Sequence, residues 1–381
     1  MAAADPIYLD HNATTPLLPE VVDAMLPYLR EHFGNPSSAH VYGVRARRAV
    51  EQARDRVARL LGCDGDEIIF TSGGTEANNL AIRGVAEACA GRRHIVTTAI
   101  EHPATERPCA WLERHGHRVT HVGVDGEGRA RLEHARGAVD DETALVTVMH
   151  SNNETGVVQP VEELAALARA KGALIHIDAA QSIGKVPLDV RALDVDLVSV
   201  AGHKLYAPKG VGALYLRRGT PLSPFALGAG HERGLRPGTE NVASIVGLAI
   251  ACEAAARDLA ELSARLARQR DELWRLLSAA VPGLALNGHG ELRLPNTLNV
   301  RFPGATGTKV LAGAPEVAAS TGSACHDGNE QASPVLLAMG IAPDAALGSV
   351  RLTLGRGTSD DEVARAAEAL ARSWRRAVGG E

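Results

Sequence analysis

The sequence predicts an α/β protein: a large domain with a mainly parallel sheet of about seven strands between helices, and a small α+β domain at the C-terminal end. From about residue 65, short apolar runs rich in Val and Ile alternate with stretches of helical period. This alternation is typical of a parallel sheet with helices on both faces. The chain of 381 residues is also too long for one compact core, which favours two domains.

Five buried strands and two helices are expected in the larger part. The helical pattern at 160–172 ends at Gly172, as helices often do. The other predicted helix covers 75–90. The strands are predicted at 67–70 (EIIF), 94–99 (HIVTTA), 144–150 (ALVTVMH), 173–178 (ALIHID) and 196–200 (DLVSV).

A long helical pattern connects the two predicted domains. It starts near Asn241 and continues to Val281, and Pro282 and Gly283 end it. A helix of this length can bridge two domains, so we place a boundary near residue 260. The segments that follow predict strands at 297–302 and 349–355 and a last helix from about residue 360. We therefore expect a large domain over 15–260, and a small domain made of 1–14 and 261–381 that carries a loop at about 321–334.

Composition and charge exclude several classes of function. The net charge of −5 provides no basic field for nucleic acid or anionic membranes, and 3% aromatic residues leave little for base stacking. The longest apolar run, at 242–252, is far shorter than the ~20 residues of a membrane-spanning helix, and the N-terminus lacks the pattern of a signal peptide. Five cysteines without a CxxC pair favour a reducing compartment over disulfides or a thiolate metal site. We expect a cytoplasmic protein with no metal, no membrane contact and no direct contact with nucleic acid.

Glycines and a threonine follow the first predicted strand, at the edge of the sheet where α/β proteins bind ligands. Gly73 and Gly74 allow close approach of the backbone, and Thr75 opens the next helix. The free amides and dipole of that helix suit a phosphate. Taken alone, Gly-Gly-Thr is better explained as a tight turn with a threonine N-cap, because it lacks the spacing of a P-loop or a dinucleotide fingerprint.

An acid and a lysine follow two successive strands. Asp178 ends one strand, and His203 and Lys204 follow the next. Pyridoxal phosphate (PLP) needs such a pair, because a lysine forms the Schiff base and an acid keeps the pyridine nitrogen protonated. A surface lysine and a helix N-cap would explain each residue singly. They would not explain why a phosphate loop, an acid and a lysine all fall at strand ends.

Two further residues at strand ends have open assignments. His102 could stack on a cofactor ring or act as an acid–base group, and a capping role is about equally favoured. Asn153 could donate a hydrogen bond to the phenolic oxygen of the cofactor, although NNETG (152–156) is also an ordinary turn.

Cys325 stands in TGSACHDGNEQASP (321–334), a setting typical of an exposed loop. Unpaired cysteines usually lie in apolar surroundings and behave as small hydrophobes. An exposed thiol is open to oxidation, so its presence favours a function. His326 or His102 could lower the pKa of this thiol and so make it reactive.

With these residues assembled, the chain resembles the cysteine desulfurases, PLP enzymes of fold type I in the class V aminotransferase group. The resemblance covers almost the whole chain, and nine motifs occur in the family's order. They are YLDHNATTP (8–16), FGNPSSAH (33–40), FTSGGTEANNLAI (70–82), EHPA (101–104), NNETGVVQP (152–160), HIDAAQSIGK (176–185), HKLYAPKG (203–210), RPGTEN (236–241) and GSAC (322–325).

The resemblance implies a role for each candidate residue at the cofactor. Lys204 would carry the Schiff base, Asp178 would pair with the pyridinium, and His102 would stack on the ring. The phenolic oxygen would be bound by Gln181 and Asn153, and the phosphate by Gly74, Thr75 and His203.

The resemblance also implies roles toward substrate and partners. Arg351 would bind the carboxylate of L-cysteine, with Asn12 and Asn153 beside it, and Cys325 would receive the sulfur as a persulfide while L-alanine leaves. Thr239 would reach the phosphate in the neighbouring subunit, which implies a homodimer with shared sites. The persulfide would pass to an acceptor protein: an iron–sulfur scaffold, a tRNA-thiolation protein or a DNA-phosphorothioation component.

One departure and three alternatives remain at this stage. Ala201 replaces a serine that often binds the phosphate in the family, so we expect weaker cofactor binding or a substituting water.

A selenocysteine lyase on the same scaffold is the nearest alternative, because ACHDGNEQASPVLL (324–337) is similar to the corresponding loop of those enzymes. An ordinary PLP aminotransferase is disfavoured by Cys325, and a catalytically idle scaffold by Lys204 and Asp178.

Overall fold

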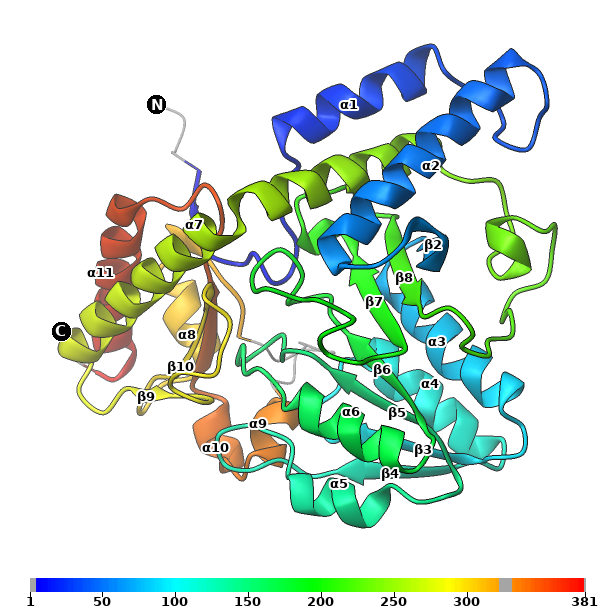
Figure 1. Ribbon diagram of the computed structural model, residues 1–381. Coiled ribbons are helices and arrows are strands. Elements are labelled where there is room, and N and C mark those ends of the chain that lie inside the picture. Colours follow the sequence, from blue (N-terminus) through cyan, green and yellow to red (C-terminus); the bar gives the residue numbers. More distant parts are fainter. Residues whose placement is uncertain (1–4, 322–330, 380–381) are drawn as a thin grey trace.

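A computed structural model describes residues 5–321 and 331–379 of the chain. Its central feature is a seven-stranded sheet in the order β2-β8-β7-β6-β5-β3-β4 (Figure 1). Strand β8 is antiparallel to both of its neighbours, and the pairs from β7 to β4 are all parallel. The strands are β2 (Ile68–Thr71), β3 (His94–Thr98), β4 (Arg118–Val122), β5 (Thr143–Met149), β6 (Leu174–Asp178), β7 (Leu197–Ala201) and β8 (Gly212–Leu216).

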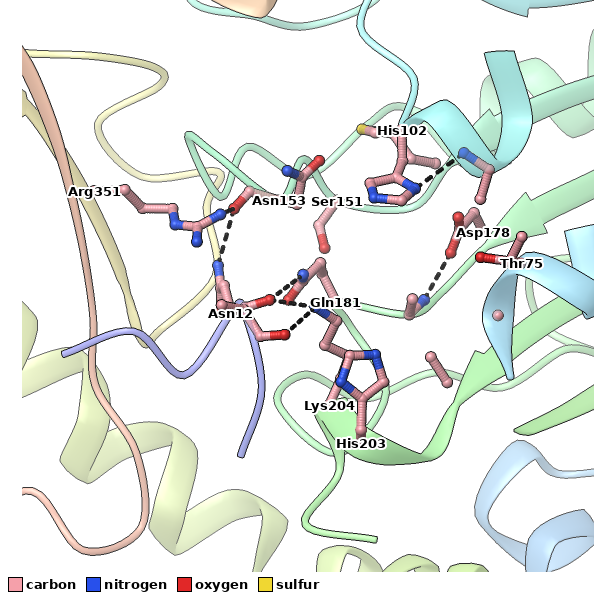
Figure 2. Close-up of a pocket in the computed structure, with 16 residues that line it drawn as sticks. Asn12, Thr75, His102, Ser151, Asn153, Asp178, Gln181, His203, Lys204 and Arg351 are labelled. Atoms are coloured by element: carbon pink, nitrogen blue, oxygen red, sulfur yellow. Dashed lines mark hydrogen bonds between the residues drawn. The ribbon is translucent and has the colours of Figure 1, made fainter. Parts of the chain in front are cut away.

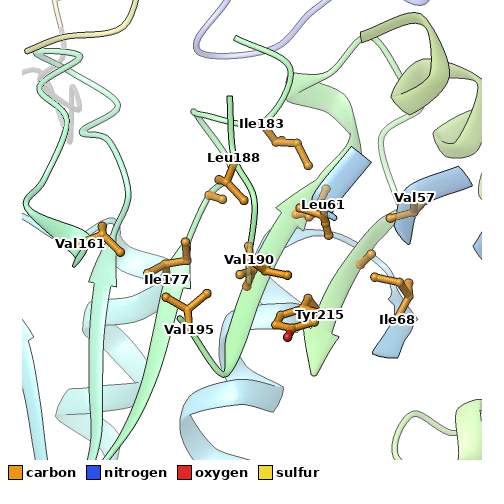
Figure 3. Close-up of a cluster of buried hydrophobic side chains, with 14 of the residues drawn as sticks. Val57, Leu61, Ile68, Val161, Ile177, Ile183, Leu188, Val190, Val195 and Tyr215 are labelled. Atoms are coloured by element: carbon orange, nitrogen blue, oxygen red, sulfur yellow. The ribbon is translucent and has the colours of Figure 1, made fainter. Parts of the chain in front are cut away.

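Helices cover both faces of this sheet, and each strand turns alternate side chains to the two faces. Phe70 packs with one group of helices, whereas its neighbour Ile69 packs with the other. Figure 3 shows part of the larger core, where Val57 of α2 and Ile177 of β6 lie among buried aliphatic side chains. The first face carries α2 (Val41–Leu61), α5 (Leu132–Ala138), α6 (Val161–Ala170) and the start of α7, and the second carries α3 (Gly74–Ala88) and α4 (Pro103–Arg114).

A second core lies at the C-terminal end of the molecule. It contains a three-stranded sheet in the order β12-β10-β9 and a two-stranded parallel pair, β1 with β11. Its elements are β1 (Ile7–Tyr8), β9 (Ala285–Leu286), β10 (Thr297–Arg301), α8 (Gly307–Ala312), β11 (Val317–Ala318), β12 (Ser349–Thr353) and α11 (Asp360–Ala377). Helices α9 (Pro334–Ala338) and α10 (Pro343–Ala346) pack in a separate apolar cluster with Ile100, Val124 and Met149.

The long helix α7 (Val242–Ala280) contributes to both cores. Its buried side chains up to Ala255 belong to the large core, and those from Leu262 onward belong to the small one. Helix α1 (Pro19–Arg30) packs along α7 on the outside (Figure 1). The boundary that we propose near residue 260 falls between the two halves of α7.

The predicted fold class is confirmed, and each predicted strand lies within two residues of an observed one. Strands β4 and β8 were not predicted. In the described part of the chain, none of the helices combines the length and the apolar character that crossing a bilayer requires.

Candidate active site

A cavity of about 360 Å³ opens at the carboxyl ends of β2, β3, β5, β6 and β7 (Figure 2). It is closed on one side by residues of the small core and of the N-terminal segment. Ten of the predicted site residues line it: Asn12, Gly74, Thr75, His102, Asn153, Asp178, Gln181, His203, Lys204 and Arg351.

The start of α3 forms the end of the cavity that suits a phosphate. Gly73 is the N-cap residue and supplies no side-chain hydrogen bond to the first turn, and its φ of 147° favours glycine. A Cβ atom on Gly74 would lie 3.2 Å from Cβ of Ala201, so the two residues pack closely. Ser199, one strand repeat before Ala201, bonds His176 through its hydroxyl at 2.9 Å and does not replace the missing serine.

Asp178 lies at the end of β6 with both carboxylate oxygens held. One accepts a hydrogen bond from Nδ2 of Asn78 at 2.7 Å, and the other accepts from the backbone amide of Ala180 at 2.9 Å. These two donors fix the orientation of the carboxylate, which is buried. Sequence reasoning missed Asn78, although it lies three residues after Thr75 and therefore on the same face of α3.

Lys204 reaches the cavity from the short 3-10 turn after β7. Its Nζ donates hydrogen bonds to the carbonyl oxygens of Asn12 at 2.6 Å and Ala13 at 2.7 Å. Burial lowers the pKa of Lys204 to about 8; the positive charge of Arg351 adds to this effect, and Asp10 and Asp178 oppose it. A lysine with this pKa has a substantial neutral fraction near neutral pH, which is the form that attacks a carbonyl carbon.

His102 is the N-cap of α4, so the capping role that the sequence left open is present. Its Nδ1 accepts from the backbone amide of Ala104 at 3.1 Å, which leaves Nε2 to carry the ring proton. Burial lowers the pKa of His102, and Asp178 opposes this shift. The ring also lines the cavity, where a neutral imidazole can stack on a planar ligand.

His203 lies beside Lys204 and is also neutral. Burial lowers the pKa of His203 to about 4, and Lys204 and Lys209 add to the shift. Its Nδ1 lies 3.3 Å from the hydroxyl of Thr14.

Arg351 comes from β12 and closes the cavity from the small core. Its guanidinium donates to Asp10 at 2.8 Å and to the carbonyl oxygen of Asn153 at 3.1 Å. Its Nε is buried and has no partner among the described residues. The N–H groups of the Arg351 guanidinium that are not used in these bonds can donate to a carboxylate ligand.

Asn12 and Gln181 are joined to each other and to Lys185, a residue that sequence reasoning missed. Nε2 of Gln181 donates to the carbonyl oxygen of Asn12 at 3.0 Å. Nζ of Lys185 donates to Oδ1 of Asn12 at 2.9 Å and to Oε1 of Gln181 at 3.0 Å. Ser151 was also missed and lines the cavity, with its hydroxyl 2.6 Å from that of Ser182.

One predicted residue, Thr239, does not line this cavity, and another, Cys325, lies outside the described residues. Thr239 is exposed in the loop before α7, away from the site of its own subunit, and its role stays a prediction. Cys325 lies outside the described residues, as does His326. On either side of that gap, Ser320 pairs with Arg351 through backbone bonds, and the hydroxyl of Ser333 donates to Glu154 at 2.5 Å.

Comparisons with known proteins agree with this geometry. The family model described as "Aminotransferase class-V" matches residues 7–366. A cysteine desulfurase of Trichormus azollae is 44% identical over 366 residues, which is 96% of this chain and 92% of the relative. A cysteine desulfurase IscS of Anaeromyxobacter sp. is 46% identical over 362 residues, 94% of this chain and 90% of the relative.

Solved structures lead to the same family. A structure titled "NIFS-LIKE PROTEIN" matches with a TM-score of 0.90 and 38% identity, over 96% of this chain and 98% of that one. SspA in complex with cysteine matches with a TM-score of 0.82 and 36% identity, over 91% and 98% of the two chains. The chain belongs to the class-V aminotransferase family and, within it, to the cysteine desulfurases.

Proposed function

We propose that this protein binds PLP and removes sulfur from L-cysteine, giving L-alanine and a persulfide on Cys325 that is passed to an acceptor protein. One observation supports the proposal most directly. Lys204, Asp178 and the open amino end of α3 all face one cavity. These are the amine, the acid and the anion site that PLP requires.

The chemistry of the residues that line the cavity fits the cofactor. Gly74 and Thr75 would hold the phosphate at the start of α3, with His203 nearby. Asp178, fixed by Asn78, would hold a proton on the ring nitrogen. PLP, when bound, supplies an electron sink for the bonds at the substrate Cα.

Substrate binding and proton movement fall to other residues of the cavity. Arg351 would bind the carboxylate of L-cysteine through donors that are now shared with Asp10 and Asn153. The polar groups of Asn12 are engaged with protein partners, so its predicted contact with substrate would share or replace one of these bonds. The amine of Lys204, once released from the cofactor, would remove the proton from Cα, because burial keeps a neutral fraction of this amine available.

Sulfur transfer needs a second thiolate, and we assign it to Cys325. Its thiolate attacks the substrate sulfur; an S–S bond forms, and the substrate C–S bond breaks with its electron pair left on the substrate. The carbon then takes up a proton to become the methyl group of L-alanine. Of the four described cysteines, Cys109 and Cys252 are buried, and burial raises the pKa of Cys63, Cys109 and Cys252 to about 12. None of these three can easily supply a thiolate.

A homodimer is part of the proposal. An exposed apolar group lies at the end of α1 and the start of α2: Leu29, Phe33, Val41, Tyr42 and Val44, with the rings of Phe33 and Tyr42 stacked at 5.5 Å. Residues 35–37, beside this group, share a surface hollow with residues 229–233 and Glu240 of the loop that carries Thr239. Pairing of two copies over this face would cover apolar surface and bring Thr239 toward the partner's phosphate site.

The deciding experiment measures products and sulfur on the protein. Wild-type protein loaded with PLP is incubated with L-cysteine, and alanine, sulfide and protein-bound persulfide are measured with and without reductant. Cys325→Ser is expected to bind PLP and L-cysteine but to lose persulfide and alanine formation. Cys89→Ser, a change at a partly accessible cysteine outside the cavity, is the matched control and is expected to keep both. Full persulfide formation in Cys325→Ser would overturn the assignment.

The same assay separates the alternatives. A strong preference for L-selenocysteine over L-cysteine would identify a selenocysteine lyase. Steady amino-group exchange with a keto acid would identify an aminotransferase. The absence of an absorbance band near ~400 nm after addition of PLP would indicate a scaffold without catalysis. The acceptor we propose is an iron–sulfur scaffold, a tRNA-thiolation protein or a DNA-phosphorothioation component, to be tested by transfer of labelled sulfur.

A further inference from the structure

Lys185 is a buried lysine with an unusual set of partners. It follows β6 in the stretch QSIGKV, and its side chain lies behind the cavity wall. Buried lysines are usually paired with a carboxylate. Here the two recorded hydrogen bonds go to the amide oxygens of Asn12 and Gln181, and the charged groups that act on it are the cations Lys204 and Arg351. Burial and these cations lower the pKa of Lys185 well below its usual value.

The contacts with Lys185 and with the Asn12 carbonyl oxygen together set which way the Gln181 amide points. Oε1 accepts from Nζ of Lys185, and Nε2 donates one of its two hydrogens to the carbonyl oxygen of Asn12. In the flipped orientation, the NH2 group would face the donor Nζ, and the oxygen would face the Asn12 carbonyl oxygen. The two oxygens would repel each other, and Nζ of Lys185 would lose its acceptor, so the observed orientation is favoured and leaves one N–H of Gln181 for a ligand.

Asn12 extends the same network to the small core. Its Oδ1 accepts from Lys185 and from Nδ2 of Asn296 at 3.1 Å, and its Nδ2 donates to the hydroxyl of Thr297 at 2.9 Å. Its carbonyl oxygen accepts from both Gln181 and Lys204. Lys185 therefore holds two of the amides that line the cavity, Asn12 and Gln181, which Figure 2 shows.

We propose that Lys185 is a positioning residue: it holds the Gln181 amide so that an N–H, and not the carbonyl oxygen, faces the phenolic oxygen of PLP. The inference rests on the proposed function, because it assumes that PLP occupies this cavity. A donor at the phenolic oxygen stabilises negative charge there and lowers the pH at which the protonated, yellow form of the bound cofactor loses its proton. Without that donor, the yellow form persists to higher pH.

The test is a pH titration of the absorbance of PLP-loaded protein. Lys185→Met lets the Gln181 amide rotate and is expected to raise the midpoint of the transition by about one pH unit. Gln181→Ala is expected to raise it similarly, and the double variant no further, because both changes remove the same hydrogen bond. Lys171→Met, at an exposed lysine whose Nζ bonds Asp141, is the matched control and should leave the midpoint unchanged.

Three outcomes overturn the inference: an unchanged midpoint in Lys185→Met, additive shifts in the double variant, or equal shifts in Lys185→Met and Lys185→Gln. Lys185→Gln retains a donor for Oε1 of Gln181 and is expected to stay near the wild-type midpoint, so it serves as the test where Lys185→Met does not fold. A wild-type protein that forms no PLP band at all would instead refute the proposed function, which keeps the two failures distinct.

Discussion

At the scale of single residues, the lowered pKa of Lys204 has a kinetic consequence. Only the neutral amine can capture PLP, and burial lowers the pKa of Lys204 to about 8. Covalent capture by the cofactor-free protein should therefore become about tenfold faster for each pH unit up to pH ~8, and then level off. Stopped-flow absorbance over a pH series measures this rate. After borohydride reduction, Lys204→Ala should carry no covalently bound PLP. A capture rate in the wild type that still rises steeply up to pH ~10 would contradict the lowered pKa of Lys204.

Glu154 gives a second prediction, which concerns stability. Burial raises the pKa of Glu154 to about 6, although the hydroxyl of Ser333 and the charge of Arg351 oppose the shift. The folded state then binds more protons than the unfolded state between the two pKa values, so this group makes the free energy of unfolding fall as pH rises from ~4.5 to ~6, by about 2 kcal/mol.

The measurement compares urea unfolding of the wild type and Glu154→Gln at pH ~5 and pH ~7. Gln keeps an acceptor for the Ser333 hydroxyl and has no charge to bury, so its stability should lack this decrease. Glu113→Gln, at an exposed glutamate, should behave like the wild type. A parallel pH dependence in wild type and Glu154→Gln would show that the buried carboxyl is not linked to stability.

The reactive groups of the cavity could be predicted from the sequence, but their supports could not. Asp178 and Lys204 each follow an apolar run, and that local pattern places them at strand ends. Asn78 holds Asp178, and Lys185 holds Asn12 and Gln181. These contacts depend on distant parts of the chain, since Asn78 and Asp178 are 100 positions apart. An asparagine on a helix and a lysine after a turn have no local pattern that distinguishes them from surface residues.

At the scale of elements, the buried ion pair between α2 and the loop before α7 supports the Thr239 region. The guanidinium of Arg54 contacts Glu232 through two bonds of 2.8 Å, and Glu232 also accepts from the amide of Phe70 in β2. Glu232 and Arg233 have positive φ values of 45° and 58°, which are strained for such residues. The ion pair therefore holds this loop in a backbone conformation that it would not adopt by itself.

Glu232→Ala should destabilise the protein by roughly 3–5 kcal/mol, because Arg54 would remain buried without its partner. Chemical denaturation measures the change. Glu272→Ala removes the partner of Arg275 in an exposed pair and should cost less than about 1 kcal/mol. Equal losses of unfolding free energy in the two variants would mean that the buried Arg54–Glu232 pair stabilises the protein no more than the exposed pair.

The two unpredicted strands of the seven-stranded sheet, β4 and β8, show what local patterns miss. Strand β4 is at the edge of the sheet, and most of its side chains are not fully buried, so it lacks an apolar run. Strand β8 has five residues and begins with Gly212. A Cβ atom at Gly212 would lie 2.7 Å from the backbone of Gly73, which explains this glycine by a tertiary contact. The helix predicted at 241–281 is confirmed by α7. It could be predicted because its helical period is sustained over many turns.

At the scale of the whole molecule, the proposed dimer predicts a link between assembly and cofactor binding. Phe33→Asp places a charge in the exposed apolar group where Phe33 is 77% accessible. It should shift the protein toward monomer and weaken PLP binding at least ~10-fold, because Thr239 would no longer reach the partner's site. Light scattering gives the mass, and absorbance titration gives the affinity.

The control for this prediction is Val378→Asp, a similar change at a residue 43% exposed near the end of α11. It should leave both the mass and the affinity unchanged. A Phe33→Asp variant that stays dimeric, or a monomer with full PLP affinity, would contradict the link between the two.

The N-terminal segment also sets the order in which the molecule can be completed. Ile7 in β1 pairs with Val317, and Asn12, which receives the hydrogen bond of Lys204, is held by Thr297 and Thr353. During synthesis, β1 and the turn that carries Lys204 leave the ribosome well before Val317 and Thr353, which help to hold the N-terminal segment in place. Because synthesis proceeds from the N-terminus, the pocket can be finished only after Thr297 and Thr353 have left the ribosome. Truncated translation products should therefore be unable to capture PLP and release sulfide in the cell.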